Sequence, residues 1–143
     1  MPDHSLFGLL CPWEQSVTIS DWIKSRVLEL SFTSWDLAGF GADFGALAPF
    51  KWNEDRRFQL RSELDAAFFH IYQLDRESSE YVMETFPLIR ARDLDRFGEY
   101  RTKRVILEIY NAMAEAERTG VPYQTRLDPP PADPRAAHPV IEP

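Results

Sequence analysis

Residues 97–116 read FGEYRTKRVILEIYNAMAEA, and this stretch decides the fold class of the chain. On a helical wheel of about 100° per residue, its apolar side chains cover a wide arc and leave only a narrow polar stripe. Such a pattern is typical of a helix at the centre of a core. We expect this helix to run from about Glu99 to Arg118, because the stop signals Gly120 and Pro122 follow. Its buried face is predicted to contain Val105, Ile106, Ile109, Ala112, Met113 and Ala116.

The start of the same stretch is crowded with basic side chains. Between positions 90 and 104, six basic residues face three acids, which leaves a local surplus of three positive charges. Such a patch can contact the phosphates of a nucleic acid. It can equally form salt bridges with the acidic remainder of the chain, and helical periodicity does not choose between the two. The basic residues are Arg90, Arg92, Arg96, Arg101, Lys103 and Arg104, and the acids are Asp93, Asp95 and Glu99.

A second long helix is predicted from Glu54 to Leu74. Asn53 is a suitable N-cap, and the two acidic residues of the first turn suit the positive end of the helix dipole. Six apolar residues share one face, whereas Phe58 and Phe69 point to the other side. We therefore expect this helix to touch two neighbours, or one neighbour and a partner protein. The shared face consists of Leu60, Leu64, Ala67, Phe68, Ile71 and Leu74.

Shorter elements surround these two helices. We expect a short helix over residues 35–44, and another that starts after the cap residue Asp75 and ends at Pro87. Residues 88–98 are expected to be a connection with at most a helical turn. Residues 21–30 fit either a short helix or the end of a strand.

The C-terminal part differs in kind, because residues 121–143 contain seven prolines. We expect an extended or disordered tail there, not a packed element. The predicted fold is therefore mainly α: a small helical domain of about three main helices over residues 1–125, followed by a proline-rich extended tail over residues 126–143. Buried positions are expected to include Leu64, Phe68, Ile71, Ile106, Ile109 and Met113.

Composition and charge limit the class of protein. Apolar residues make up 44% of the 143 residues and aromatic residues 13%, which is typical of a globular protein. The net charge of −7 argues against a stand-alone nucleic-acid binder, since such proteins are usually basic. The lone Cys11 excludes an intramolecular disulfide and favours a reducing compartment. Without a signal-peptide pattern or an apolar run of about 20 residues, we expect a cytoplasmic protein that does not enter a membrane.

The sequence lacks the motifs of enzymes that act on DNA. None of the three lysines has an acid two positions before it, which excludes a PD-(D/E)xK nuclease centre within the chain. The glycines of GFGADFG (39–45) do not follow an apolar strand, so we expect no loop for S-adenosylmethionine. In LDPPPADP (127–134), Pro131 stands where a methyltransferase needs an aromatic residue to stack on a flipped base. His70 has no second ligand at helical spacing, so we predict no metal, no cofactor and no catalytic residue.

Three segments together resemble a known family. They are PFKWNEDRRFQLRSELDAAFFHIYQL (49–74), YVMETFPLIR (81–90) and GEYRTKRVILEIYNAMAEAERTGVPYQTRLDPPPADPR (98–135). Their order and wording resemble the extreme C-terminal region of type IIG-like restriction–modification proteins. These are fused adenine-specific DNA methyltransferases and include those of phage-defence islands. The resemblance covers residues 27–125 of the helical domain and continues into the tail as far as Arg135.

The resemblance implies that the methyltransferase core, with its cofactor and N-P-P-Y loops, lies outside this segment. The chain would then be a fragment or split subunit from the end of the target-recognition region, without enzyme activity of its own. Its expected partners are a methyltransferase core polypeptide and, in the complex, DNA. Gly98 would let the backbone approach closely at the basic turn. The candidate DNA-binding residues are Arg101, Lys103 and Arg104, with Arg56, Arg57 and Arg61 as a second group.

An alternative comes from a different class of function. The chain also fits a helical protein-interaction module with no DNA contact, which would expose Phe58, Phe69 and its tryptophans to a partner and use the tail as a clamp. The acidic net charge favours this alternative, and the resemblance favours DNA recognition. The two are compatible, because a split segment must dock on its own methyltransferase.

Overall fold

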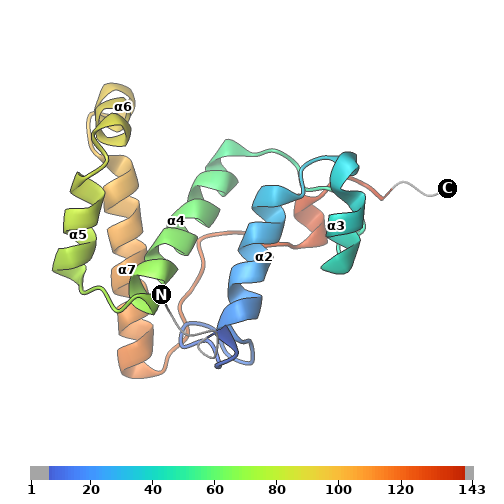
Figure 1. The fold of residues 1–143 in the computed structure, drawn as a ribbon, viewed down its shortest axis with the longest axis horizontal. Helices are drawn as coiled ribbons and strands as arrows, with labels where there is room; N and C mark the ends of the chain where they lie inside the picture. The colour runs from blue at the N-terminus through green and yellow to red at the C-terminus, as the bar shows by residue number, and fades with distance from the viewer. Residues whose placement is uncertain (1–6, 141–143) are drawn as a thin grey trace.

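The computed structural model describes residues 7–140, which form helices joined by loops (Figure 1). This part of the chain contains six α-helices, two short 3-10 helices and two isolated β-bridges, and no strand. The prediction of a mainly helical fold is confirmed, although the helices outnumber the three main ones expected. The α-helices are α2 (Ile19–Ser31), α3 (Ala38–Asp43), α4 (Glu54–Ile71), α5 (Arg76–Glu84), α6 (Pro87–Phe97) and α7 (Arg101–Thr119).

Helix α7 is the central element, as its sequence predicted. It packs against α4, α5 and α6, and α4 packs in turn against α2. Ile106, Ile109 and Met113 are at most 1% exposed, which confirms the main part of the predicted buried face. Trp13, which precedes α2, and Trp22, which lies in α2, are equally buried and belong to the same core. The core therefore contains residues from the N-terminal segment and α2 as well as from α4, α5 and α7.

Helix α4 lies between α2 and α7, which confirms the expectation of two neighbours. Leu60 and Ala67 are fully buried as predicted. Leu64, Phe68 and Ile71 are only partly buried, so this part of the burial prediction was wrong. The reason is that a helix between two neighbours buries residues on two sides, whereas the wheel assigned all burial to one apolar stripe.

The predicted helix caps are present. The side chain of Asn53 accepts a hydrogen bond from the Arg56 amide at 3.0 Å, which starts α4. The side chain of Asp75 accepts one from the Ser78 amide at 2.7 Å, which starts α5. Gly120 ends α7 with φ of 77°, a left-handed conformation that favours glycine. The short polar residues of the sequence thus set these boundaries.

Two segments are more helical than predicted. Helix α5 ends at Glu84, before Pro87 as predicted. Pro87 also begins α6, so the segment expected to be a connection is an 11-residue helix. Proline suits this first position, because its missing N–H would have no partner there. Residues 19–31 form α2, which begins where the Thr18 side chain accepts from the Asp21 amide, so the strand alternative was wrong. The helix expected over residues 35–44 is divided into a 3-10 turn and α3.

The proline-rich C-terminal segment packs against the domain, so the expectation of an unpacked tail was wrong. We call residues 121–140 the C-terminal strap; it leaves the end of α7 and runs across the molecule towards α3 (Figure 1). Leu127 and Ala136 of the strap are 6% and 8% exposed. The Lys51 amide donates to the Ala136 carbonyl at 2.9 Å. Proline prevents a helix here, but it does not prevent an extended segment from being buried.

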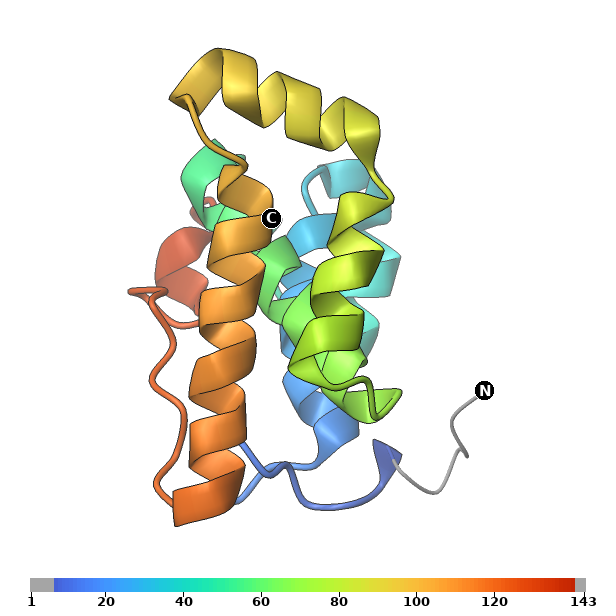
Figure 2. The same ribbon diagram turned by 90° about the vertical axis from the view of Figure 1, so that its left-hand side faces the viewer.

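The molecule has two distinct ends along its longest axis (Figure 1). At one end, which we call the α6 end (residues 85–101), helix α6 lies across the ends of α5 and α7 (Figure 2). At the other, the α3 end (residues 35–50 and 132–140), a small second core joins α2, the loop after α3 and the strap. This core consists of Leu28, Phe32, Phe50 and Ala136.

Candidate functional site

Lys103, a predicted DNA-binding residue of the basic turn, is paired with acids of the chain itself. Its Nζ lies 3.1 Å from an oxygen of Glu80 and 2.5 Å from an oxygen of Glu84, both on α5. These contacts raise the pKa of Lys103, and the hydrogen bond with Glu84 is the main cause. Lys103 therefore joins α7 to α5, and its charge is already balanced by two carboxylates.

Arg104 is also paired within the chain. Its Nε and Nη2 donate to Glu99 at 2.9 Å, and its Nη1 donates to Glu108 at 2.9 Å. The pKa of Arg104 is raised, chiefly by Glu99 and then by Glu108. Arg126 of the strap shares Glu108 at 2.9 Å. A phosphate that contacted Arg104 would have to compete with two carboxylates.

Arg101 has a different environment, because its guanidinium group lies between two aromatic rings. Its Cζ is 4.1 Å from the ring centre of Phe58 and 4.0 Å from that of Phe97. Such cation–π contacts hold the start of α7 against α4 and α6. Gly98, just before it, ends α6 with φ of 70°, and a Cβ added there would meet nothing within 4 Å. Gly98 therefore ends a helix here, and the structure shows no close approach of the backbone.

Arg56, from the second predicted group, binds the strap together with a buried acid. Its Nε and Nη2 donate to the two carboxylate oxygens of Glu29 at 2.8 and 2.7 Å. Its Nη1 donates to the carbonyl of Pro129 at 2.6 Å. The Ala132 amide donates to the same Glu29 at 3.0 Å. The Arg56–Glu29 pair therefore holds the strap against α2 and α4.

Arg57 and Arg61 complete the second group, and within residues 7–140 only Arg57 forms a side-chain hydrogen bond or a ring contact. Arg57 lies 3.7 Å over the ring of Trp52 and donates to the Leu30 carbonyl at 3.0 Å. Burial is the main cause that lowers its pKa. Arg61 is exposed and forms no ion pair or side-chain hydrogen bond with residues 7–140. Lys103 of the basic turn therefore contacts acids of α5, and Arg56 contacts the strap. The six candidate DNA-binding residues do not come together in one site.

A second buried carboxylate, that of Glu63, lies in α4 and was not among the predicted site residues. Glu63 is 1% exposed and accepts hydrogen bonds from Arg26 Nε at 3.0 Å, Tyr123 Oη at 2.7 Å and Thr125 Oγ1 at 2.8 Å. Burial and the charge of Glu63 raise the pKa of Tyr123. The available signal was an acid three or four residues from Leu60, Ala66 and Ala67 on a predicted helix, because a charge on an apolar face requires a partner.

His70 and Cys11, whose residue types often serve as metal ligands or nucleophiles, are packed within the protein. The His70 ring stacks on Tyr110 with centroids 4.0 Å apart, and its Nε2 lies 2.9 Å from the Tyr110 carbonyl oxygen. Cys11 is buried, which raises the pKa of its thiol. Within residues 7–140, no group of three or more His, Cys, Asp and Glu side chains is placed to hold a metal ion.

A pocket lies at the α3 end, and no sequence signal pointed to it. Its volume is about 400 Å³, and it lies between α2, the loop that follows α3, and the strap. Leu28, Phe50 and Ala137 are among its apolar lining residues. Leu47 and Phe44 also line it and remain 73% and 43% exposed. The polar lining residues are Asp21, Lys24, Ser25 and His138.

Comparisons with known proteins do not assign the chain to a family. No protein-family model matches the chain, and no match was found among curated proteins or solved structures. Within the described part of the chain, none of the helices has the length and apolar character needed to cross a membrane.

Proposed function

We propose that the chain is a non-catalytic docking segment of a restriction–modification or phage-defence adenine DNA methyltransferase. It binds the methyltransferase core polypeptide through the α3 end, and the resulting complex binds DNA. The resemblance of three segments to the C-terminal region of type IIG-like proteins supports the choice of partner. The observation that carries the docking role is the apolar pocket beside exposed Leu47 and Phe44.

The pocket has the properties of a site for a buried anchor residue. Protein interfaces concentrate their binding energy in a few aromatic or aliphatic side chains that enter well-packed pockets. A pocket of about 400 Å³ with a mostly apolar lining accommodates one such side chain and its neighbours. Leu47 and Phe44 line the pocket and remain largely exposed, so their apolar surface stays in contact with water until a partner covers it.

The second candidate function is a protein-interaction module with no DNA contact. The pairing of Lys103 with Glu80 and Glu84 favours it, because the basic turn then offers little uncompensated charge. The expected anchors need correction, since Phe58 and Phe69 are partly buried against the core. In this alternative the exposed Leu47 and Phe44 take their place, and the DNA contacts predicted for the six basic residues do not form.

A binding titration tests the proposed function. The methyltransferase core polypeptide of the same organism is titrated with the chain in a calorimeter, and Leu47→Asp is compared with wild type. We expect Leu47→Asp to weaken binding at least about tenfold, which corresponds to about 1.4 kcal/mol. The matched control is Leu88→Asp at the α6 end, where Leu88 is 84% exposed. Equal affinities for wild type and Leu47→Asp, or no binding by wild type, would contradict the proposal.

The DNA part of the proposal separates the two candidates. A complex of core and chain that binds a mixed-sequence duplex no more tightly than the core alone would favour the module without DNA contact. The isolated chain is expected neither to transfer a methyl group nor to cut DNA. Incorporation of tritiated methyl above a blank by the purified chain would overturn this expectation.

A further inference from the structure

Helix α6 carries an unusual share of the basic residues that have no partner in the chain. Among residues 7–140, six lysines and arginines form no ion pair, side-chain hydrogen bond or ring contact, and three of them lie on this one helix of 11 residues. Outside α6, seven of the ten arginines within residues 7–140 are paired with an acid. The six residues are Lys24, Lys51, Arg61, Arg90, Arg92 and Arg96.

One of the two acids of α6 is turned into the protein. Asp93 is 2% exposed, and its carboxylate accepts a hydrogen bond from the Thr102 amide at 2.7 Å. This bond caps the start of α7, whose own N-cap residue supplies no side-chain cap. Asp93 therefore does not neutralise the outer surface of α6, where three exposed arginines face the single exposed acid Asp95.

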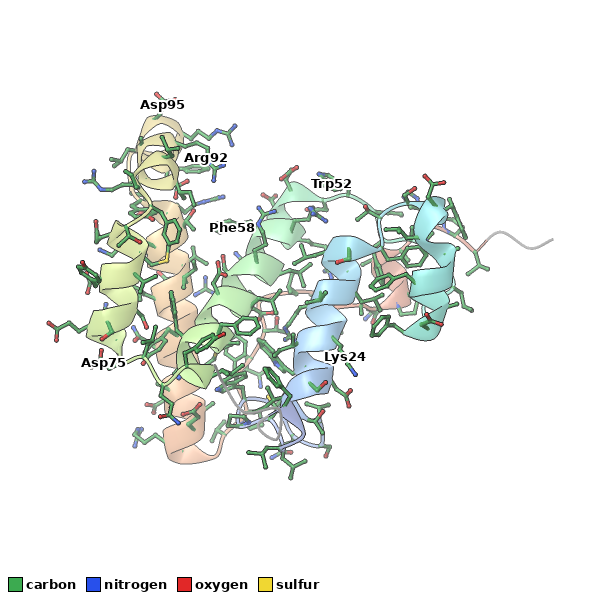
Figure 3. The ribbon with its side chains drawn as sticks, viewed as in Figure 1. Lys24, Trp52, Phe58, Asp75, Arg92 and Asp95 are labelled. Carbon is green, nitrogen blue, oxygen red and sulfur yellow. The ribbon has the colours of Figure 1, made fainter. Side chains whose placement is uncertain are left out.

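Two of these arginines are placed to act together. Arg92 and Arg96 are four residues apart, so they lie on the same side of the helix, with their Cβ atoms about 6 Å apart. Helix α6 lies across the end of the bundle, which leaves its outer side uncovered by other elements (Figure 2). Asp95 lies at the tip of the molecule, on the outer side of α6 (Figure 3). Arg92 projects from the flank of α6, on the side of the molecule where Phe58 lies (Figure 3).

We infer that Arg92 and Arg96 contact the phosphate backbone of duplex DNA. The inference rests on the proposed function, because that function supplies DNA as the partner. Both arginines are exposed and unpaired within the described chain, so a phosphate displaces only water from them. At Arg104, by contrast, a phosphate would have to replace Glu99 and Glu108. The DNA-facing surface is thus α6 and not the basic turn that follows it.

An NMR titration locates the contact. The isotopically labelled full chain is titrated with a mixed-sequence duplex of about 20 base pairs at about 20 mM salt, where weak electrostatic binding is strongest. We expect amide shifts to concentrate in residues 88–97. Shifts concentrated at residues 101–104, or no shifts at all, would overturn the inference. An equal response of residues 88–97 to polyglutamate at the same charge concentration would also overturn it, because the surface would then bind any polyanion.

A charge-matched pair of variants tests the two residues. Arg92→Ala with Arg96→Ala is expected to lower the salt slope of binding by about two units, since each phosphate contact contributes about one. Arg118→Ala with Arg135→Ala removes the same charge from two exposed, ion-paired arginines and is expected to leave the slope unchanged. Equal losses in both variants would mean that only net charge matters. If the DNA experiments give a contradicting result but the chain still binds the methyltransferase core, this inference is wrong and the proposed docking role remains.

Discussion

The Nε of Arg26 lies 3.0 Å from a carboxylate oxygen of Glu63, and the two side chains are only 4% and 1% exposed. Removal of one partner from such a buried pair leaves an uncompensated charge in the core, which costs about 3–5 kcal/mol. We therefore predict that Glu63→Ala lowers the free energy of unfolding by this amount. The measurement is a urea unfolding curve of the variant and the wild type.

The control for this prediction is Glu115→Ala, which removes an exposed acid paired with the exposed Arg118. Surface pairs contribute little, so its unfolding midpoint should stay close to that of wild type. Equal stability of Glu63→Ala and wild type would show that the buried pair does not hold α2, α4 and the strap together.

Gly41 in α3 is predicted to accept no side chain. A Cβ at this position would lie 2.1 Å from Cε2 of Phe32, a fully buried ring that has no room to move. Gly41→Ala should therefore destabilise the protein by at least about 1–3 kcal/mol, the range for overpacked cores. Gly39→Ala is the matched control in the same helix, because an added Cβ there meets nothing within 4 Å. It should be neutral or stabilising by up to about 1 kcal/mol, and unfolding curves in which Gly41→Ala matches it would contradict the packing at the α3 end.

Tyr123 is predicted to make the protein lose stability at high pH. Burial and the neighbouring Glu63 carboxylate raise the pKa of Tyr123 in the folded state, whereas the unfolded chain keeps the ordinary value of about 10. The stabilisation is thus complete below pH of about 10 and falls above it, by up to about 1.4 kcal/mol per pH unit. Tyr123→Phe should show a shallower loss between pH of about 10 and 12, because it lacks this proton. Identical slopes in the two unfolding series would mean that Tyr123 ionises freely in the folded protein.

The sequence predicted the helical elements best where one physical signal acted alone. The apolar arc of α7 and the cap residues Asn53 and Asp75 are local features, and the structure places them as expected. The stop of α5 before Pro87 was predicted correctly, but α6 was missed, because a proline can also begin a helix and the packing of α6 on α7 is not visible in the sequence. The strap was missed because its burial depends on Glu29 and Glu63, which are far from it in sequence.

The candidate site was harder to predict than the fold. The surplus of basic residues near Lys103 and Arg104 is correct as a count, but their neutralising partners include Glu80 and Glu84 on another helix. Sequence spacing does not show such a pairing between helices. The pocket at the α3 end is likewise formed by three segments that only the folded chain brings together. The DNA contacts of the six predicted cations stay a prediction, and our inference about α6 places the contact at Arg92 and Arg96 in preference to Arg101, Lys103 and Arg104.

We propose that the α3 end binds the methyltransferase core and the α6 end binds DNA, and hydrogen exchange distinguishes these two contacts. Exchange is measured by mass spectrometry for the chain alone, with the methyltransferase core polypeptide, and with core and duplex DNA together. We expect slower exchange in residues 44–48 and 132–138 when the core is added. We expect slower exchange in residues 88–97 only when DNA is also present. Unchanged exchange at the α3 end in a complex that has formed would contradict the claim, as would protection of residues 88–97 by the core alone.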